Sequence, residues 1–278
     1  MGQSEPKSPA GSQAAGSPPS LPRTSETMVV VGSATPVPLA ESSATVLVIP
    51  VEPELLRIQT PLDLLREDSS ILLEQRGAGG AQSDLVLRGG GFAQTLVLVN
   101  GFRINDSQTA HHNLDLPIPL EAMDQVQVLH GAGSTLHGAD ALAGAVDFLT
   151  VAPQSGSLLV RAGGGSFGQN EQALMAGGVH RSWSGRITGD RNFSTGFMAD
   201  RDYRNEDVSA EGWSGTRLGI TDLLFATSDR SFGANQSFKG PDTPGVTGPA
   251  TPGWVQNSGS GAAPNALRKR SGPPRRPL

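Results

Sequence analysis

The chain has 278 residues and a formal net charge of −5, which gives no general reason to expect nucleic acid as a partner. It contains no cysteine, so disulfides and thiolate chemistry are excluded. Hydrophobic residues make up 36% of the chain and aromatic residues only 5%, which suits a small core flanked by loose segments. No apolar run approaches the ~20 residues of a membrane helix.

The first 25 residues are rich in Pro, Ser, Gly and Ala. Such a segment buries too little apolar surface to offset its ordering entropy, so we expect a disordered leader over residues 1–25. It lacks the apolar central region of a secretory signal peptide. We interpret this as a misplaced start or as a fragment of a longer protein.

Structural signals begin with a strand and a helix. Residues 45–49 read as a first strand, and residues 54–59 as a short helix. Thr60-Pro61-Leu62-Asp63 is a good helix start, with Thr as N-cap, Pro at the first position and Asp at the third. The leucines that follow supply an apolar face, which predicts a core helix.

The middle of the chain predicts a small sheet. Residues 85–87 and 95–99 are apolar strand runs separated by three glycines. Asn100-Gly101 supplies the positive φ values of a two-residue turn, and residues 102–104 return as the next strand. Residues 126–129 and 145–150 complete the strands of this region.

These motifs resemble, in kind and in order, the plug domain of TonB-dependent outer-membrane receptors. Leu87-Arg88-Gly89 and residues 96–105 match the family's strand-RG-loop-strand-(N/D)-G-hairpin motif, and residues 128–150 match its closing motif. The sequence departs from the family at Gln127 and His130, where Glu and Arg are usual, and at His137, where an aromatic residue is usual. The resemblance covers roughly residues 26–232.

The resemblance implies an α+β plug domain with a small mixed sheet. The first four or so antiparallel strands of an incomplete transmembrane β-barrel would follow, and both tails would be disordered. The implied boundaries are a leader at 1–25, a TonB box and linker at 26–35, the plug at 36–153, the start of the barrel at 154–236, and a Pro/Gly-rich basic tail at 237–278.

The resemblance also implies site residues. The TonB box is the family's short energy-coupling segment. In this chain an acidic residue, a Thr and a β-branched run match it, and we expect a flexible segment suited to strand addition. An ordinary β-strand is the alternative. The residues of the box are Glu26, Thr27, Met28, Val29, Val30, Val31 and Gly32. Two polar loops, 76–84 and 105–117, correspond to the outward-facing plug apices, with Gln82, Asp106, Gln108, His111, His112 and Asn113 as ligand-contact candidates and solvated loops as the alternative.

The plug-motif residues are Arg88, Gly89, Asn100, Gly101 and Arg103. We expect the two arginines to pair with carboxylates in the plug or the barrel wall; surface arginines are the alternative. No spacing of Asp, Glu and His brings a catalytic pair together, so we expect no enzyme, no cofactor and no metal site. Adjacent histidines on a strand point to opposite sides, which makes His111-His112 a poor metal ligand pair.

Beyond residue 153 the sequence pattern changes to longer segments of mixed polarity. Residues 157–163, 170–179, 184–193 and 211–224 read as strands of mixed polarity, with a charged loop at 199–209. The resemblance makes them barrel strands that face lipid on one side; a soluble antiparallel meander is the alternative. Residues 241–278 predict a disordered tail, and their composition resembles translation in a shifted frame.

The functional expectation is a receptor or transporter fragment of the outer membrane. TonB with its inner-membrane motor and a scarce ligand, such as a ferric siderophore or cobalamin, would be its partners, and nucleic acid would not. A soluble plug-like binding module and a non-functional gene fragment are the alternatives. Because four strands cannot close a barrel around a plug, we expect no transport by this chain alone.

Overall fold

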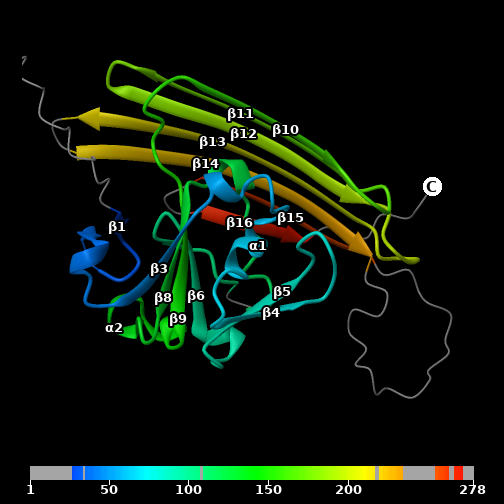
Figure 1. The fold of residues 1–278 in the computed structure, drawn as a ribbon, viewed down its shortest axis with the longest axis horizontal. Helices are drawn as coiled ribbons and strands as arrows, with labels where there is room; N and C mark the ends of the chain where they lie inside the picture. The colour runs from blue at the N-terminus through cyan, green and yellow to red at the C-terminus, as the bar shows by residue number, and fades with distance from the viewer. Residues whose placement is uncertain are drawn as a thin grey trace, which may run out of the picture.

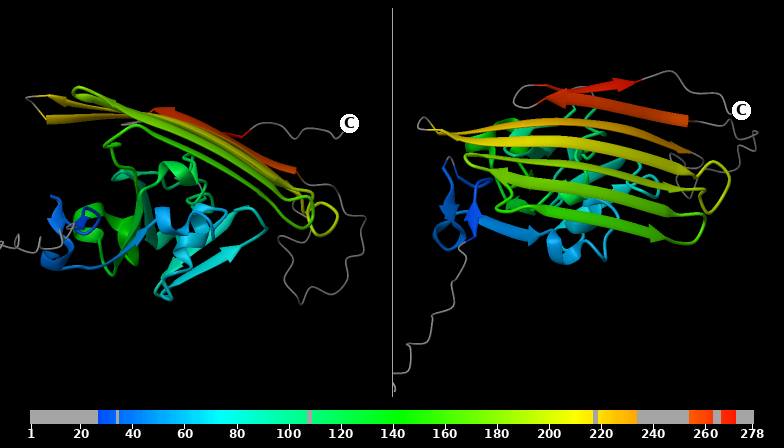
Figure 2. Two further views of the ribbon diagram at one scale, coloured as in Figure 1. Left: turned by 45° about the horizontal axis from the view of Figure 1, so that its top comes forward. Right: turned by 90° about the horizontal axis from the view of Figure 1, so that it is seen from above.

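The computed structural model describes residues 27–33, 35–106, 109–216, 219–233, 254–262 and 266–271. A compact plug lies beneath a large, curved antiparallel sheet, here called the wall (Figure 1). Seen from above, the wall strands run side by side across the plug (Figure 2). No helix in the described ranges is long and apolar enough to cross a membrane.

The plug is built on a five-stranded mixed sheet, as the sequence predicted. Its strands lie in the order β3-β8-β9-β6-β7, and only the β6–β9 pair is parallel. They are β3 (Thr45–Pro50), β6 (Thr95–Val99), β7 (Phe102–Arg103), β8 (Gln125–His130) and β9 (Gly144–Leu149). Both faces of the sheet are covered, because the alternating side chains enter two separate apolar clusters.

The larger cluster holds α1 (Pro61–Leu65), whose three leucines are all buried. The predicted start of this helix is confirmed: the Thr60 N–H donates to Asp63 Oδ2 at 3.0 Å. The helix predicted over residues 54–59 is wrong. The turn there is η2 (Glu52–Glu54), a single 3-10 turn with Pro53 near its start.

Short elements fill the rest of the plug. A separate hairpin joins β4 (Ile71–Gln75) to β5 (Ser83–Leu87), and the sequence analysis had identified only the second of these strands. The remaining elements are β1 (Met28–Val29), β2 (Val37–Pro38), η1 (Leu39–Glu41), η3 (Phe92–Gln94), η4 (Leu120–Ala122), α2 (Ser134–His137) and η5 (Ala139–Ala141).

The wall contains more strands than predicted. Its seven strands pair with their chain neighbours throughout, as β10 (Ser157–Gly164), β11 (Asn170–His180), β12 (Trp183–Ser194), β13 (Tyr203–Thr216), β14 (Gly219–Gly233), β15 (Trp254–Ala262) and β16 (Ala266–Ser271). In the described part of the chain the sheet is open, with β10 and β16 as its edges. Five of these strands, β10 to β14, lie in the stretch 154–236, where about four were predicted.

Two wall predictions are wrong in detail. The strand predicted at 211–224 combines the end of β13 with the start of β14, and most of the charged loop predicted at 199–209 is strand. Charge does not break this strand, because Asp207 pairs with Arg230 on the side facing the plug while Glu206 pairs with Arg191. The tail predicted to be disordered contains β15 and β16, whose backbones extend the ladder.

Candidate ligand and energy-coupling sites

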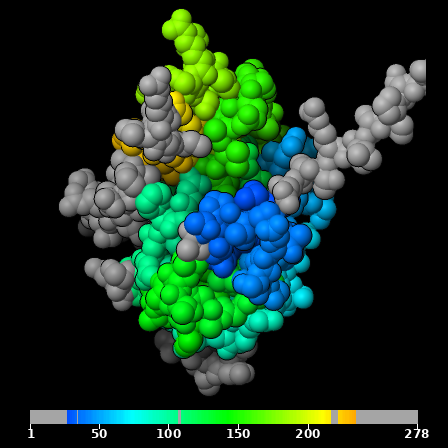
Figure 3. All heavy atoms as spheres, turned by 90° about the vertical axis from the view of Figure 1, so that its left-hand side faces the viewer, coloured from blue at the N-terminus to red at the C-terminus, as the bar shows by residue number. Residues whose placement is uncertain are grey.

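The segment proposed as a TonB box is docked on the plug. In its described part, β1 pairs with β2, and Met28 lies opposite Pro38. The Val29 and Val31 side chains are 0% and 1% exposed and pack with Leu96, Leu98 and Leu129. Figure 3 shows this N-terminal segment, in blue, covering one face of the plug. The expectation of a flexible segment is thus not met over these residues; Glu26 lies outside the described residues.

Two plug side chains hold the backbone of this segment. Gln127 Oε1 accepts hydrogen bonds from the N–H groups of Val30 at 2.8 Å and Val31 at 3.2 Å. Gln127 Nε2 donates to the Met28 carbonyl at 2.8 Å, and His137 Nε2 lies 2.8 Å from the Val31 carbonyl. Two of the three positions that depart from the family pattern, Gln127 and His137, therefore contact the candidate box.

The two polar loops come together through one histidine. His111 Nδ1 lies 2.9 Å from Asp84 Oδ1, and the imidazole stacks on Phe92 with ring centroids 4.4 Å apart. The Nδ1 atom of His112 lies 2.9 Å from a different carboxylate, Asp115 Oδ2. The described residues contain no group of three or more metal-ligating side chains.

The other ligand-contact candidates differ in their access to solvent. Asn113 is 4% exposed, and its Oδ1 accepts the Asp106 N–H at 2.7 Å, so it positions its own loop. Gln82 is half-buried. Gln108 lies outside the described residues. His111 therefore combines an aromatic neighbour, a carboxylate and partial exposure, which makes it the strongest contact candidate in this set.

The loop at residues 76–84 is hydrogen-bonded to the wall side of the molecule. Arg201 donates to the Arg76 carbonyl, and Asn205 donates to the Gly79 carbonyl. Gly79 has φ of +65°, and a Cβ there would lie 2.3 Å from the ring of Tyr203. Movement of this loop would therefore displace contacts with β13 directly. The sequence alone does not predict this connection.

The plug-motif residues have structural roles. Arg88 and Gly89 adopt positive φ, as do Asn100 and Gly101 with φ of +51° and +77°. Arg103 forms the expected ion pair, with Asp140, and also donates to the His137 carbonyl at 2.6 Å. Arg88 is exposed and has no carboxylate partner among the described residues, so that prediction is wrong.

Wall arginines fasten the plug at residues that the sequence analysis missed. Arg161 reaches Glu121 at 2.6 Å, and Arg186 reaches Asp124 at 3.1 Å. Arg230 donates to the Leu116 carbonyl at 2.6 Å. Their signal in the sequence is weak, because a basic residue inside a strand becomes meaningful only when its inward direction is known.

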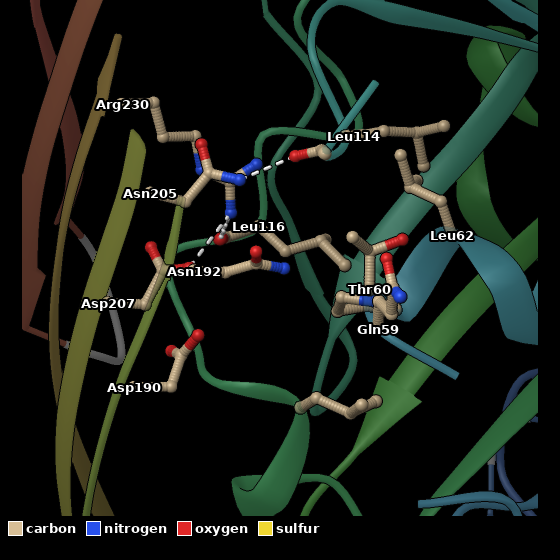
Figure 4. Close-up of a pocket in the computed structure, with 14 residues that line it drawn as sticks. Gln59, Thr60, Leu62, Leu114, Leu116, Asp190, Asn192, Asn205, Asp207 and Arg230 are labelled. Carbon is tan, nitrogen blue, oxygen red and sulfur yellow. Dashed lines mark hydrogen bonds and ion pairs between the residues drawn. The ribbon is translucent and has the colours of Figure 1, made fainter. Parts of the chain in front are cut away.

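A polar cavity lies in this seam between plug and wall (Figure 4). Asp190, Asn192 and Asp207 line its wall side, and Leu62 and Leu116 lie on its plug side. Its volume is about 20 Å³, roughly the room that one water molecule needs. It is far too small to be the binding site of a siderophore or a cobalamin.

One titratable plug residue is strongly perturbed. Asp147, at the centre of β9, is 1% exposed. Burial raises the pKa of its carboxyl to about 7, although the Gly101 N–H, which donates to Oδ1 at 3.1 Å, works in the opposite direction. Below about pH 7 this sheet therefore carries a carboxyl group that holds its proton.

Comparison with known proteins agrees with this architecture. Residues 39–145 match the family described as TonB-dependent Receptor Plug Domain. A vitamin B12 transporter BtuB of Vibrio vulnificus is 33% identical over 168 residues, which cover 56% of this chain and 27% of that protein. A BtuB of Vibrio cholerae is 31% identical over 148 residues, covering 52% and 23%. This chain thus spans about a quarter of the length of these relatives.

Solved structures share the fold. The copper transporter OprC has a TM-score of 0.58 at 19% identity, over 80% of this chain and 34% of that one. The pyoverdine receptor FpvA of Pseudomonas aeruginosa has a TM-score of 0.60 at 16% identity, over 73% and 30%. The family match itself is confined to residues 39–145, which correspond to the plug domain of TonB-dependent receptors. The strands that follow this domain form the open antiparallel wall described above.

Proposed function

We propose that this chain serves as the plug and first wall strands of an outer-membrane receptor that gates energy-coupled uptake of a scarce ligand. The observation that carries the proposal is the N-terminal segment, an extended β-branched run docked on a plug sheet. The outward side chains of the wall support a membrane setting, since Leu158 and Val160 of β10 are 73% and 71% exposed.

In this proposal residues 26–32 are the handle and the plug sheet is the gate. TonB, driven by its inner-membrane motor, would pair with the handle by strand addition and pull on it. Force on the handle would reach β8 through Gln127 and α2 through His137, because these side chains bond its backbone. The seam contacts to Glu121 and Asp124 would then resist movement of the plug away from the wall.

The ligand in this proposal is a ferric siderophore, cobalamin or a similar scarce molecule. The support is the similarity to vitamin B12 transporters and to a pyoverdine receptor. The surface around Phe92 and His111 offers a stacking ring and polar atoms, which suit a large ligand of mixed polarity.

The handle can be tested with peptides that cover residues 25–33. A TonB C-terminal domain should bind the wild-type peptide, and Val30→Pro should weaken binding because it removes a ladder N–H. Val30→Ala is the matched control, since it trims the side chain and keeps the N–H. Equal binding of the wild-type and proline peptides in a calorimetric titration would refute the handle.

A further inference from the structure

We infer that Gln127 is the positioning residue that determines whether the 27–31 segment is available to another sheet. Its side-chain amide takes the place of a partner strand and occupies the backbone groups that strand addition would use. This inference rests on the proposed function, since it assigns the control of the same segment to one named residue.

The hydrogen bonds of the segment are already in use along both edges. Leu39 N–H donates to the Thr27 carbonyl at 2.8 Å, and β2 pairs with β1 on the same side. The Gln127 side chain donates a hydrogen bond to the Met28 carbonyl and accepts hydrogen bonds from the N–H groups of Val30 and Val31. An incoming strand pairs through such main-chain groups, so it must first displace either β2 or the Gln127 amide.

Gln127 is placed where it cannot readily turn away. It lies in the centre of β8, between Val48 of β3 and Asp147 of β9, and it is 0% exposed. A buried amide that loses its partners leaves both donors and acceptors unsatisfied. The bonded position is therefore strongly favoured while the segment is docked, and the segment and the side chain hold each other in place.

The chemistry of the contact requires an amide. Glutamine both donates and accepts, and this site uses both functions, whereas an ionised glutamate only accepts. A glutamate here would keep its bonds to Val30 and Val31, but it would face the Met28 carbonyl with no proton to donate. It would also lie directly across the strand pair from Asp147. A glutamine at this position thus favours a more firmly docked segment than a glutamate would.

The absence of cysteine from the chain makes this inference directly measurable. In the full chain, Val31→Cys places a thiol at a site that is 1% exposed, so its labelling rate by a maleimide reports undocking. Adding Gln127→Met should accelerate labelling at least about tenfold, since three hydrogen bonds are lost. Gln127→Glu should give a smaller acceleration and keeps the test valid if the methionine variant unfolds.

Gln125→Met is the matched control. Gln125 lies two residues away on the same strand, pairs with Pro50 and Leu149, and bonds no part of the segment. It should leave the labelling rate unchanged. If Gln127→Met and Gln127→Glu both label at the wild-type rate while the plug stays folded by circular dichroism, the inference is overturned.

A second measurement separates this inference from the proposed function. The full chain is titrated with a TonB C-terminal domain beside the 25–33 peptide, and the Gln127→Met chain should bind more tightly than the wild-type chain. Faster labelling without binding by any chain or peptide would leave the role of Gln127 intact and refute the handle. Binding of the peptide together with equal labelling rates for all chains would support the handle and refute the role of Gln127.

Discussion

The plug and the wall reach their folded states in different ways. The plug sheet is covered on both faces, with Val97, Val146 and Phe148 in one apolar cluster and Leu96 and Ala145 in the other. The wall has one face on the plug and presents large apolar side chains on the other. The plug therefore carries its own core, whereas the wall depends on the plug on one side and on apolar surroundings on the other.

Separating the two regions should give the largest effect. Residues 37–150 expressed alone should unfold cooperatively in urea, because most of the buried residues of each cluster lie within them. Residues 154–233 alone should aggregate, since their apolar outer face and both sheet edges would be open to other chains. A soluble, monomeric wall fragment in gel filtration would show that the comparison is wrong.

The same contrast explains what the sequence predicted. In the plug, local chemistry fixes the backbone: Thr60 and Asp63 start a helix, and Asn100-Gly101 makes a turn whatever surrounds it. In the wall, the strand-like pattern continues through residues 211–224, and nothing in it marks the end of β13 at Thr216. Strand ends there are fixed by pairing with neighbours, which one sequence does not record.

The candidate site was harder to predict than the fold. The segment at residues 26–32 was found from its composition and its place ahead of the plug, but its docking was not. Gln127 is 97 residues from Val30 in the chain, and its role depends on the direction of a single side chain. The only signal was its departure from the usual glutamate, which drew attention to the position without saying what it touches.

Within the plug, Gly144→Ala should be among the most damaging single changes. Gly144 has φ of +149°, and a Cβ there would lie 2.2 Å from the Leu129 carbonyl oxygen and 2.3 Å from Leu87 Cδ2. We expect a loss of about 4 kcal/mol or more in the free energy of unfolding. Gly212→Ala in the wall is the control, because a Cβ there meets nothing within 4 Å. Similar urea midpoints for the two variants would contradict this prediction.

Asp147 gives the plug a pH dependence of known sign. Its pKa is about 7 in the folded chain against an ordinary value of 3.8, so the folded state binds the proton more tightly than the unfolded state. Stability from this group is fully present below about pH 4 and is lost as the pH rises to about 7. Asp147→Asn should therefore stabilise the plug by about 2–4 kcal/mol at pH 8.

The difference between Asp147→Asn and wild type isolates this group from the other carboxylates, which titrate equally in both chains. That difference, measured by urea unfolding at several pH values, should shrink as the pH falls from 8 to 4. A difference that stays constant with pH would mean that Asp147 does not hold its proton in the folded plug.

The smallest effect tests the turn that the sequence predicted best. Gly101 has φ of +77°, and a Cβ there would meet nothing within 4 Å, so Gly101→Val costs only the left-handed backbone conformation. We expect a loss of about 1–2 kcal/mol. Gly101→Asn should lose less, because asparagine tolerates positive φ. Since both substitutions add a side chain in open space, their difference reports the backbone alone, and equal urea midpoints for the valine and asparagine variants would show that the turn does not require this conformation.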